Sequence, residues 1–402
     1  MTKRQGLALV VIVLLALNLR PVMAGLGPLL DIIEHATGIS SAGAGMLTTL
    51  PIFLMGLGAF AGRRIRRLFG ERRGGALGIA LVALACASRL AWNDKTGMFL
   101  TAATAGLGIA IVQGLVPGII KQWFGAATGR AMGLYTTGIM GGAALAAATA
   151  AGLSRLIGWQ ATLAIWSLPA LFALVCWLVV PAPETPARPN QDHTHKSFWR
   201  SRRAWLLMLF FGIGTGAYTL VLAWLPPFYM GLGQSRDMSG YLLAGLTLAE
   251  VVAGLGVSTL IGRFPDRRGP LIAVLLCLLI GLACLILAPV SLALAAIPLI
   301  GVGIGALFPL SLIITLDHAD DPAVAGDLAA FVQGGGYMIA SAMPFIAGLI
   351  RDRFADLSQA WGLMAAGVVV LIAMALRFSP TSARKMSRSP TKPSGVGALH
   401  PP

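Results

Sequence analysis

The stretch LALVVIVLLALNLRPVMAGLGPLL, from Leu7 to Leu30, is apolar over a length that crosses a bilayer as a helix, yet it carries an arginine near its middle. Placing Arg20 in the membrane costs about 2.5–3.5 kcal/mol on insertion scales, so we expect its side chain to face protein or a water-filled cavity. Pro21 has no N–H, which leaves the carbonyl of Leu17 without its helical partner. The sequence therefore predicts a bend or a loosened turn between Leu17 and Pro21, with a charge and a free carbonyl at the same depth in the membrane.

The composition places the chain among polytopic membrane proteins. Of its 402 residues, 57% are hydrophobic and only 11% are charged, and the mean hydropathy is +0.81. The first apolar run is a full span long and lacks a small-residue cleavage site, so we interpret it as a mature helix. The net charge of +15 is spread over many short loops, which argues against a nucleic-acid partner. The four cysteines lie in apolar runs without metal-ligand spacing, and we predict neither a metal nor a cofactor.

Twelve apolar runs of the length that a tilted transmembrane helix needs follow one another along the chain. They are Leu7–Leu30, Ala42–Ala61, Ala76–Trp92, Met98–Ile120, Met132–Leu153, Ala161–Val180, Trp205–Tyr229, Tyr241–Ile261, Leu271–Leu287, Leu292–Leu316, Leu328–Ile350 and Ala360–Leu376. The predicted fold class is an all-α integral membrane protein with twelve transmembrane helices.

The basic residues predict the orientation, because lysine and arginine collect in cytoplasmic loops. With the N-terminus inside, the outer side keeps only Arg89, Lys95, Arg155, Arg236, Arg351 and Arg353. The inner side receives the rest, including six arginines between residues 63 and 73. One inner segment, from Asp317 to Asp321, has acids and no base, although acids count little in this rule. We expect a multi-pass protein of the bacterial inner (cytoplasmic) membrane with both termini in the cytoplasm.

A proline-rich polar segment divides the runs into two sets of six. We predict an N-terminal six-helix bundle at residues 1–182, a cytoplasmic linker at 183–203, a C-terminal six-helix bundle at 204–378 and a disordered cytoplasmic tail at 379–402. Sliding one half by 200 residues superposes Gly45, Gly56 and Gly62 on Gly245, Gly256 and Gly262, which favours a parallel repeat.

The loop after the eighth run carries Gly262-Arg263-Phe264-Pro265-Asp266-Arg267-Arg268-Gly269, which fits the pattern Gly-x-x-x-Asp-Arg-x-Gly. This loop resembles the signature of the major facilitator superfamily after its helices two and eight. The resemblance implies two six-helix parallel repeats with a site at their interface, and a gating role for Gly262, Asp266, Arg267 and Gly269. The loop after the second run has Arg66 where the signature has aspartate, and its arginines could instead hold the loop at anionic lipid.

No nucleotide-binding loop, zinc-protease motif or partnered nucleophile occurs in the sequence, so we do not expect an enzyme. Besides Arg20, one charge lies in the middle of a span, Glu250 in the eighth run. Two interpretations stay open for it. The carboxylate could carry a proton in symport, or it could be a structural group that accepts a hydrogen bond or pairs with a buried base.

Polar groups beside helix breaks form a second set of candidates. Gln113 precedes Pro117 by four residues, Trp224 precedes two prolines, and Gln333 lies one turn from Tyr337. In the superfamily, helices one, four, seven and ten line the central cavity, so several of these positions are implied to face it. The alternative for Gln113 and Gln333 is an interhelical hydrogen bond.

Further stretches resemble the cyanate permease branch of the superfamily, which also contains 2-nitroimidazole exporters. They are Leu17-Asn18-Leu19-Arg20-Pro21, Gly27-Pro28-Leu29-Leu30, residues 109–114, residues 223–229, Leu316-Asp317-His318, residues 322–326 and residues 331–334. The leading hypothesis is a secondary transporter of a small monovalent anion, cyanate being the candidate, that works by alternating access as a monomer. Arg20, Asn18, Gln113, Trp224, Gln333 and Tyr337 are then the expected substrate-binding residues. The alternative is export of 2-nitroimidazole-like or other small heteroaromatic compounds, with Arg20 paired to Glu250.

Overall fold

The computed structural model describes residues 3–92, 94–180, 198–319 and 322–378. The predicted tail at 379–402 and residues 183–197 of the predicted linker lie outside these described residues. The elements of the first half are α1 (Lys3–Leu17), α2 (Pro21–Ala24), η1 (Gly27–Leu29), α3 (Leu30–Thr37), α4 (Ser41–Phe69), α5 (Glu71–Ser88), α6 (Lys95–Phe124), η2 (Gly125–Ala127), α7 (Thr128–Ala164) and α8 (Ser167–Val179). Those of the second half are α9 (Arg202–Gly231), α10 (Arg236–Leu260), η3 (Ile261–Arg263), α11 (Arg268–Leu287), α12 (Ala293–Leu316), α13 (Pro322–Phe354) and α14 (Ser358–Ala375).

These elements make twelve membrane spans, as predicted. Nine helices within the described residues are long and apolar enough to cross a membrane, and α5, α8 and α13 complete the set. The first span consists of α1, α2, η1 and α3. Gly158, with φ 80° and ψ 160°, interrupts α7 where the fifth span ends and the sixth begins. The fifth and sixth spans therefore follow each other without a loop.

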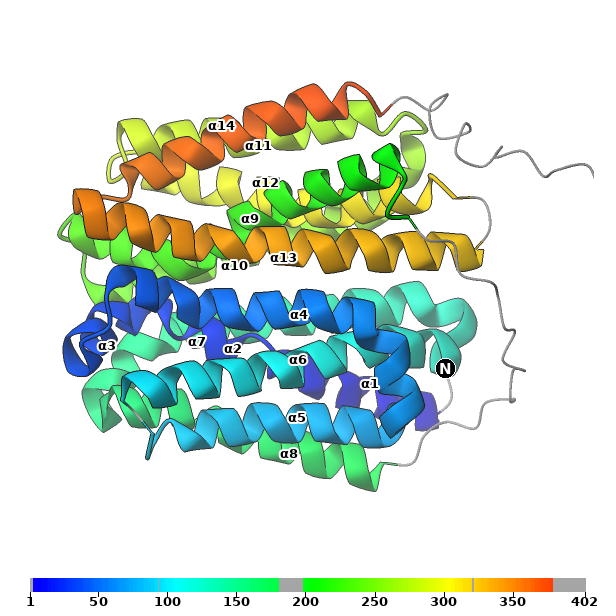
Figure 1. The fold of residues 1–402 in the computed structure, drawn as a ribbon, viewed down its shortest axis with the longest axis horizontal. Coiled ribbons are helices and arrows are strands. Elements are labelled where there is room, and N and C mark those ends of the chain that lie inside the picture. The colour runs from blue at the N-terminus through cyan, green and yellow to red at the C-terminus, as the bar shows by residue number, and fades with distance from the viewer. Residues whose placement is uncertain (1–2, 93, 181–197, 320–321, 379–402) are drawn as a thin grey trace, which may run out of the picture.

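Successive spans run in opposite directions, so alternate loops lie at the same end of the bundle. The two ends differ in charge, because most basic residues lie in the loops and helix ends of one of them. We call the end with Lys3, Arg66, Arg202 and Arg377 the basic end, which lies on the right in Figure 1. The opposite end carries α3 and lies on the left. Several helices extend beyond the apolar runs: α4 continues to Phe69 and takes part of the arginine cluster into its last turns.

The two six-helix halves form two layers, and α4 of the first half runs beside α13 of the second across the middle of Figure 1. Small residues allow this close approach. A Cβ atom at Gly56 of α4 would lie 2.7 Å from the carbonyl oxygen of Gly334 in α13. On the other side of the interface, α7 packs against α10. Without a hydrophobic force between helices in lipid, such close backbone packing holds the halves together.

The predicted break in the first span is confirmed. α1 ends at Leu17, and α2 begins at Pro21 with Arg20 as its N-cap residue. The N–H groups of Asn18 and Leu19 donate to carbonyls three residues back, which tightens the last turn of α1. Gly142 of α7 packs directly on the carbonyl of Leu17, and a Cβ there would overlap it. The break therefore lies against α7 in the interior of the protein, where Arg20 is only 5% exposed.

Candidate functional site

A cavity of about 890 Å³ lies between the two halves. Its polar lining residues include Arg20, Gln113, Tyr135, Thr215, Tyr218, Thr219, Glu250, Ser311, Gln333 and Tyr337. The lining continues to the exposed residues Arg130 at the start of α7 and Thr259 at the end of α10. Both lie toward the basic end, so the cavity opens at that end.

At the opposite end, charged groups join the two halves. Arg236 of α10 pairs with Asp31 of α3 at 2.9 Å, and Arg351 of α13 pairs with Glu34 at 3.2 Å. Asp352 of α13 accepts hydrogen bonds from the first backbone N–H groups of α4, at 2.8 and 2.9 Å. A further pair joins Arg155 of α7 to Asp237 of α10. These contacts close the end of the bundle that faces away from the cavity mouth.

Arg20 lies on the cavity with little to balance its charge. One guanidinium nitrogen donates to the sulfur of Met55 at 3.6 Å, a weak acceptor, and the ring of Tyr218 lies 5.4 Å from the guanidinium carbon. The Nε atom is buried and has no hydrogen-bond partner in the described part of the chain. The break in the first span thus places a buried cation on the cavity, and the surrounding side chains satisfy only part of its charge and hydrogen-bonding capacity.

Glu250 of α10 lies on the same cavity and is 4% exposed. Neither carboxylate oxygen has a hydrogen-bond partner among the described residues. The carboxylate interacts electrostatically with Arg20, but the two groups do not come within the 4.0 Å of an ion pair. The pairing of Arg20 with Glu250 expected for a resident ion pair is therefore not formed in this structure.

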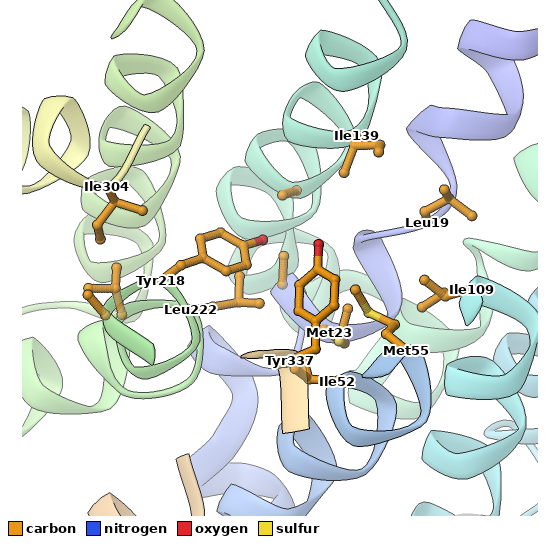
Figure 2. Packing of buried hydrophobic residues seen from close by; sticks show 14 of the residues in the cluster. Leu19, Met23, Ile52, Met55, Ile109, Ile139, Tyr218, Leu222, Ile304 and Tyr337 are labelled. Atoms are coloured by element: carbon orange, nitrogen blue, oxygen red, sulfur yellow. The ribbon is translucent and has the colours of Figure 1, made fainter. Parts of the chain in front are cut away.

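Two tyrosines that the sequence did not single out also line this cavity. The hydroxyls of Tyr135 on α7 and Tyr218 on α9 are buried and have no hydrogen-bond partner within the described residues. Leaving a buried hydroxyl unpaired costs about 1–3 kcal/mol. Figure 2 shows Tyr218 and Tyr337 with their hydroxyls directed toward the same region. The only sequence signal for these residues was a phenol within an apolar run, near the start of the fifth run for Tyr135 and in the middle of the seventh for Tyr218.

The assignment of Arg89 to an outer loop is corrected by the structure. This residue was counted among the basic residues of an outer loop, but its side chain is 1% exposed at the end of α5. One guanidinium nitrogen donates to the carbonyl of Val22 at 2.9 Å, and Nε donates to the hydroxyl of Thr101 at 3.3 Å. Val22 lies two residues after Arg20, in the broken part of the first span. Arg89 therefore supports the segment that carries Arg20.

The cavity brings together five of the residues that the sequence singled out, which are Arg20, Gln113, Glu250, Gln333 and Tyr337. Asn18 and Trp224 do not line it. The amide of Asn18 donates to the carbonyls of Leu14 and Pro169, so it joins α1 to α8. The indole N–H of Trp224, which is fully buried, donates to the carbonyl of Pro344 at 2.8 Å. Neighbouring backbone carbonyls thus already use the donors of Asn18 and Trp224.

The loop expected to act in gating lies at the basic end, between α10 and α11. Arg267 donates to Asp317 at 3.1 Å and to the carbonyl of Ile261 at 2.6 Å, so it ties this loop to the end of α12. Asp266 accepts from Arg268 at 2.7 Å, and this hydrogen bond holds the pKa of Asp266 below its usual value. Gly262 lies in η3, and Gly269 lies in the first turn of α11.

The family profile described as Major Facilitator Superfamily matches residues 11–344 of the chain. The cyanate transport protein CynX of Escherichia coli (strain K12) is 37% identical over 92% of this chain and 97% of its own length. The 2-nitroimidazole transporter of the same organism is 30% identical over 90% of this chain and 91% of its own.

Solved structures share the fold. An inward-facing, occupied bacterial homolog of the human lysosomal transporter Spinster has a TM-score of 0.76 at 16% identity, covering 97% of this chain and 100% of that one. The inward-open xylose transporter XylE from E. coli has a TM-score of 0.76 at 14% identity, covering 94% of this chain and 99% of that one. The chain therefore belongs to the Major Facilitator Superfamily and is a multi-pass membrane transporter, not an enzyme.

Proposed function

We propose that this secondary transporter moves a small monovalent anion by alternating access, with cyanate as the candidate. The observation that carries the proposal is Arg20, a buried cation on the cavity whose described partners are a thioether and an aromatic ring. The name of the 37% identical relative, a cyanate transport protein, supports the choice of anion.

The expected strength of binding suits transport. Two unit charges 4 Å apart at an effective dielectric constant near 20 attract by about 4 kcal/mol, part of which offsets desolvation of the anion. A binding free energy of about −4 kcal/mol corresponds to a millimolar dissociation constant. Gln113, Gln333 and Tyr337 supply neutral hydrogen-bond donors on the same cavity. One arginine with such neighbours holds the ion weakly and releases it quickly.

The orientation follows from the charge of the two ends. The basic end is the cytoplasmic one by the positive-inside rule, so both termini are cytoplasmic and the cavity opens inward. The protein acts as a monomer in the bacterial inner membrane. The loop with Gly262, Asp266, Arg267 and Gly269 then lies at the cytoplasmic mouth, where the Arg267–Asp317 contact ties it to α12 of the same half.

Glu250 is the proposed carrier of a coupled proton. Its carboxyl lies on the substrate cavity, without a hydrogen-bond partner in the described residues and within electrostatic range of Arg20. When an anion pairs with Arg20, protonation of Glu250 neutralises the carboxylate, so that the site does not hold two negative charges. Anion binding and proton binding are thereby linked, and each strengthens the other.

The second candidate is export of a small heteroaromatic compound. The aromatic side chains of Phe210, Phe211 and Phe308 on the cavity favour it, together with the 30% identical 2-nitroimidazole transporter. In that case Arg20 and Glu250 would pair as resident charges, an arrangement that this structure does not contain. The separation of the two charges therefore favours the anion.

Uptake of labelled cyanate into proteoliposomes tests the proposal. Arg20→Gln should lose uptake and Arg20→Lys should keep a reduced rate, because only the lysine retains a cation. Arg353→Gln is the matched control, since it removes an exposed arginine outside the cavity and should transport normally. Full transport of cyanate by Arg20→Gln would rule out the anion mechanism. Export of a labelled nitroimidazole by a protein that ignores cyanate would support the second candidate.

A further inference from the structure

Unpaired buried polar atoms are concentrated around Arg20. Eight buried side-chain nitrogen or oxygen atoms in the described residues have no hydrogen-bond partner, and five of them belong to Arg20, Tyr135, Tyr218 and Glu250. All four residues line the cavity between the halves. Native proteins pair nearly all of their buried polar groups, so such a concentration needs a cause. A transported ligand supplies that cause, because it is bound only during part of the cycle.

Tyr135 and Tyr218 come from different halves of the protein. Tyr135 lies on α7 and is 3% exposed, whereas Tyr218 lies on α9 and is 9% exposed. Both phenols interact electrostatically with Arg20, and the ring of Tyr218 lies 5.4 Å from the guanidinium carbon. Two phenols from opposite halves of the protein therefore lie within electrostatic range of one cation.

Packing alone does not explain these hydroxyls. Phenylalanine at either position would fill the same space and would not bury an unpaired polar atom. Tyr229, also on α9, is a useful contrast. Its hydroxyl donates to the carbonyl of Pro289 at 2.9 Å, outside the cavity, so that hydroxyl has a structural partner.

We propose that the hydroxyls of Tyr135 and Tyr218 donate hydrogen bonds to the anion held at Arg20, one from each half, and that they select anions with acceptor atoms at two ends. The inference rests on the proposed function and assigns the residues that determine its specificity. A linear anion such as cyanate or thiocyanate has an acceptor atom at each end, so each half can hold one end. A halide offers a single centre, which the donors of both halves have to share.

The test uses the purified full-length protein, titrated with potassium cyanate in a calorimeter. Tyr135→Phe and Tyr218→Phe should each weaken cyanate binding about 10-fold or more, the usual effect of losing a hydrogen bond to a charged group. Tyr229→Phe is the matched control and should bind cyanate as the wild type does. Bromide binding should change less than cyanate binding in the two cavity variants.

Thermal unfolding without anion separates a binding role from a structural one. Tyr135→Phe and Tyr218→Phe should unfold at the wild-type temperature or above it, because each removes an unpaired buried hydroxyl. Tyr229→Phe should unfold at a lower temperature, because it loses a made hydrogen bond. A fall in both stability and affinity for the cavity variants would indicate a structural role and overturn the inference.

The failures are distinguishable. Wild-type binding of cyanate with unchanged dissociation constants in both cavity variants overturns the inference and leaves the proposed function standing. Equal weakening of bromide and cyanate overturns the selection of two-ended anions. A wild-type protein that binds neither cyanate, thiocyanate nor bromide overturns the proposed anion function, and the inference with it.

Discussion

The guanidinium of Arg20 and the carboxylate of Glu250 line one cavity, both almost fully buried, and they form no ion pair. Opposite charges in such a site attract strongly, because the surrounding dielectric constant is low. Keeping them apart leaves Arg20 available to an anion and Glu250 available to a proton. Arg20 lies on the broken first span and Glu250 on α10, so the two groups belong to different halves.

Glu250→Gln should remove the dependence of anion accumulation on a pH gradient, since glutamine does not take up or release a proton. Exchange of anion for anion across the proteoliposome membrane should persist, because it needs no net proton movement. Uptake measured with and without an imposed gradient checks this. Asp356→Asn, which changes an exposed carboxylate that bonds Ser358 within its own half, is the control and should keep the dependence. Accumulation that still follows the gradient in Glu250→Gln would make the carboxylate structural.

Arg89→Met should weaken anion binding from a distance. It loses the donors to Val22 and Thr101, and each bond from a charged donor is worth about 1.5–3 kcal/mol. The segment around Arg20 then loses its support, so we expect a higher KM for the anion together with a lower unfolding temperature. Thr101→Val, which removes only the weaker bond, should show a smaller effect of the same kind. A normal KM in Arg89→Met would show that the break is held by other contacts.

Asp352→Asn should favour the conformation that is open at the opposite end. The carboxylate of Asp352 caps α4 of the other half through the N–H groups of Ser41 and Ala42, and a helix cap is worth about 1 kcal/mol. The ratio of the two conformations should therefore change about fivefold.

Spin labels at Lys95 and Gln359, exposed residues of the two halves at the opposite end, would report this change as a larger fraction of long distances. The control is Asp356→Asn, because Asp356 bonds Ser358 within its own half and should leave the distances unchanged. An unaltered distance distribution in Asp352→Asn would show that this cap does not influence the ratio of the two conformations.

His318 should make stability depend on pH. It lies after α12 and is 4% exposed, and burial lowers its pKa below the ordinary value of 6.5. Arg203, which donates to Nε2 of the ring at 3.0 Å, acts in the same direction, whereas the carbonyl of Ile314 and the charge of Asp317 act against it.

Because the unfolded chain binds this proton more readily than the folded one, stability should fall as the pH drops below 6.5 and should level off below the folded pKa. Unfolding temperatures measured between about pH 5 and pH 8 check this. His318→Gln should flatten that dependence, and the exposed His35→Gln should leave it intact. An equally steep dependence in His318→Gln would assign it to another group.

Much of the cavity could be anticipated from residues that are costly in a membrane. Arg20 and Glu250 had to face the interior because lipid does not solvate charge, and Pro21 had to interrupt the first span because it lacks an N–H. Gln113, Gln333 and Tyr337 also lie on the cavity. Asn18 and Trp224 do not, because the carbonyls that accept their hydrogen bonds come from Leu14, Pro169 and Pro344, two of them far away in the sequence. Spacing along one helix does not reveal such partners.

The sequence by itself determined the twelve spans and the break that carries Arg20, because hydrophobic length and the chemistry of proline act locally. It also indicated the superfamily, through the Gly-x-x-x-Asp-Arg-x-Gly loop. Only the tertiary structure decided which polar groups meet at Arg20 and which are already paired. It brought Tyr135 and Tyr218 of different halves to the cavity that Arg20 lines, buried the side chain of Arg89, which the sequence had assigned to an outer loop, and kept Glu250 out of ion-pair distance. Those relations depend on how two six-helix halves pack, and no single span contains them.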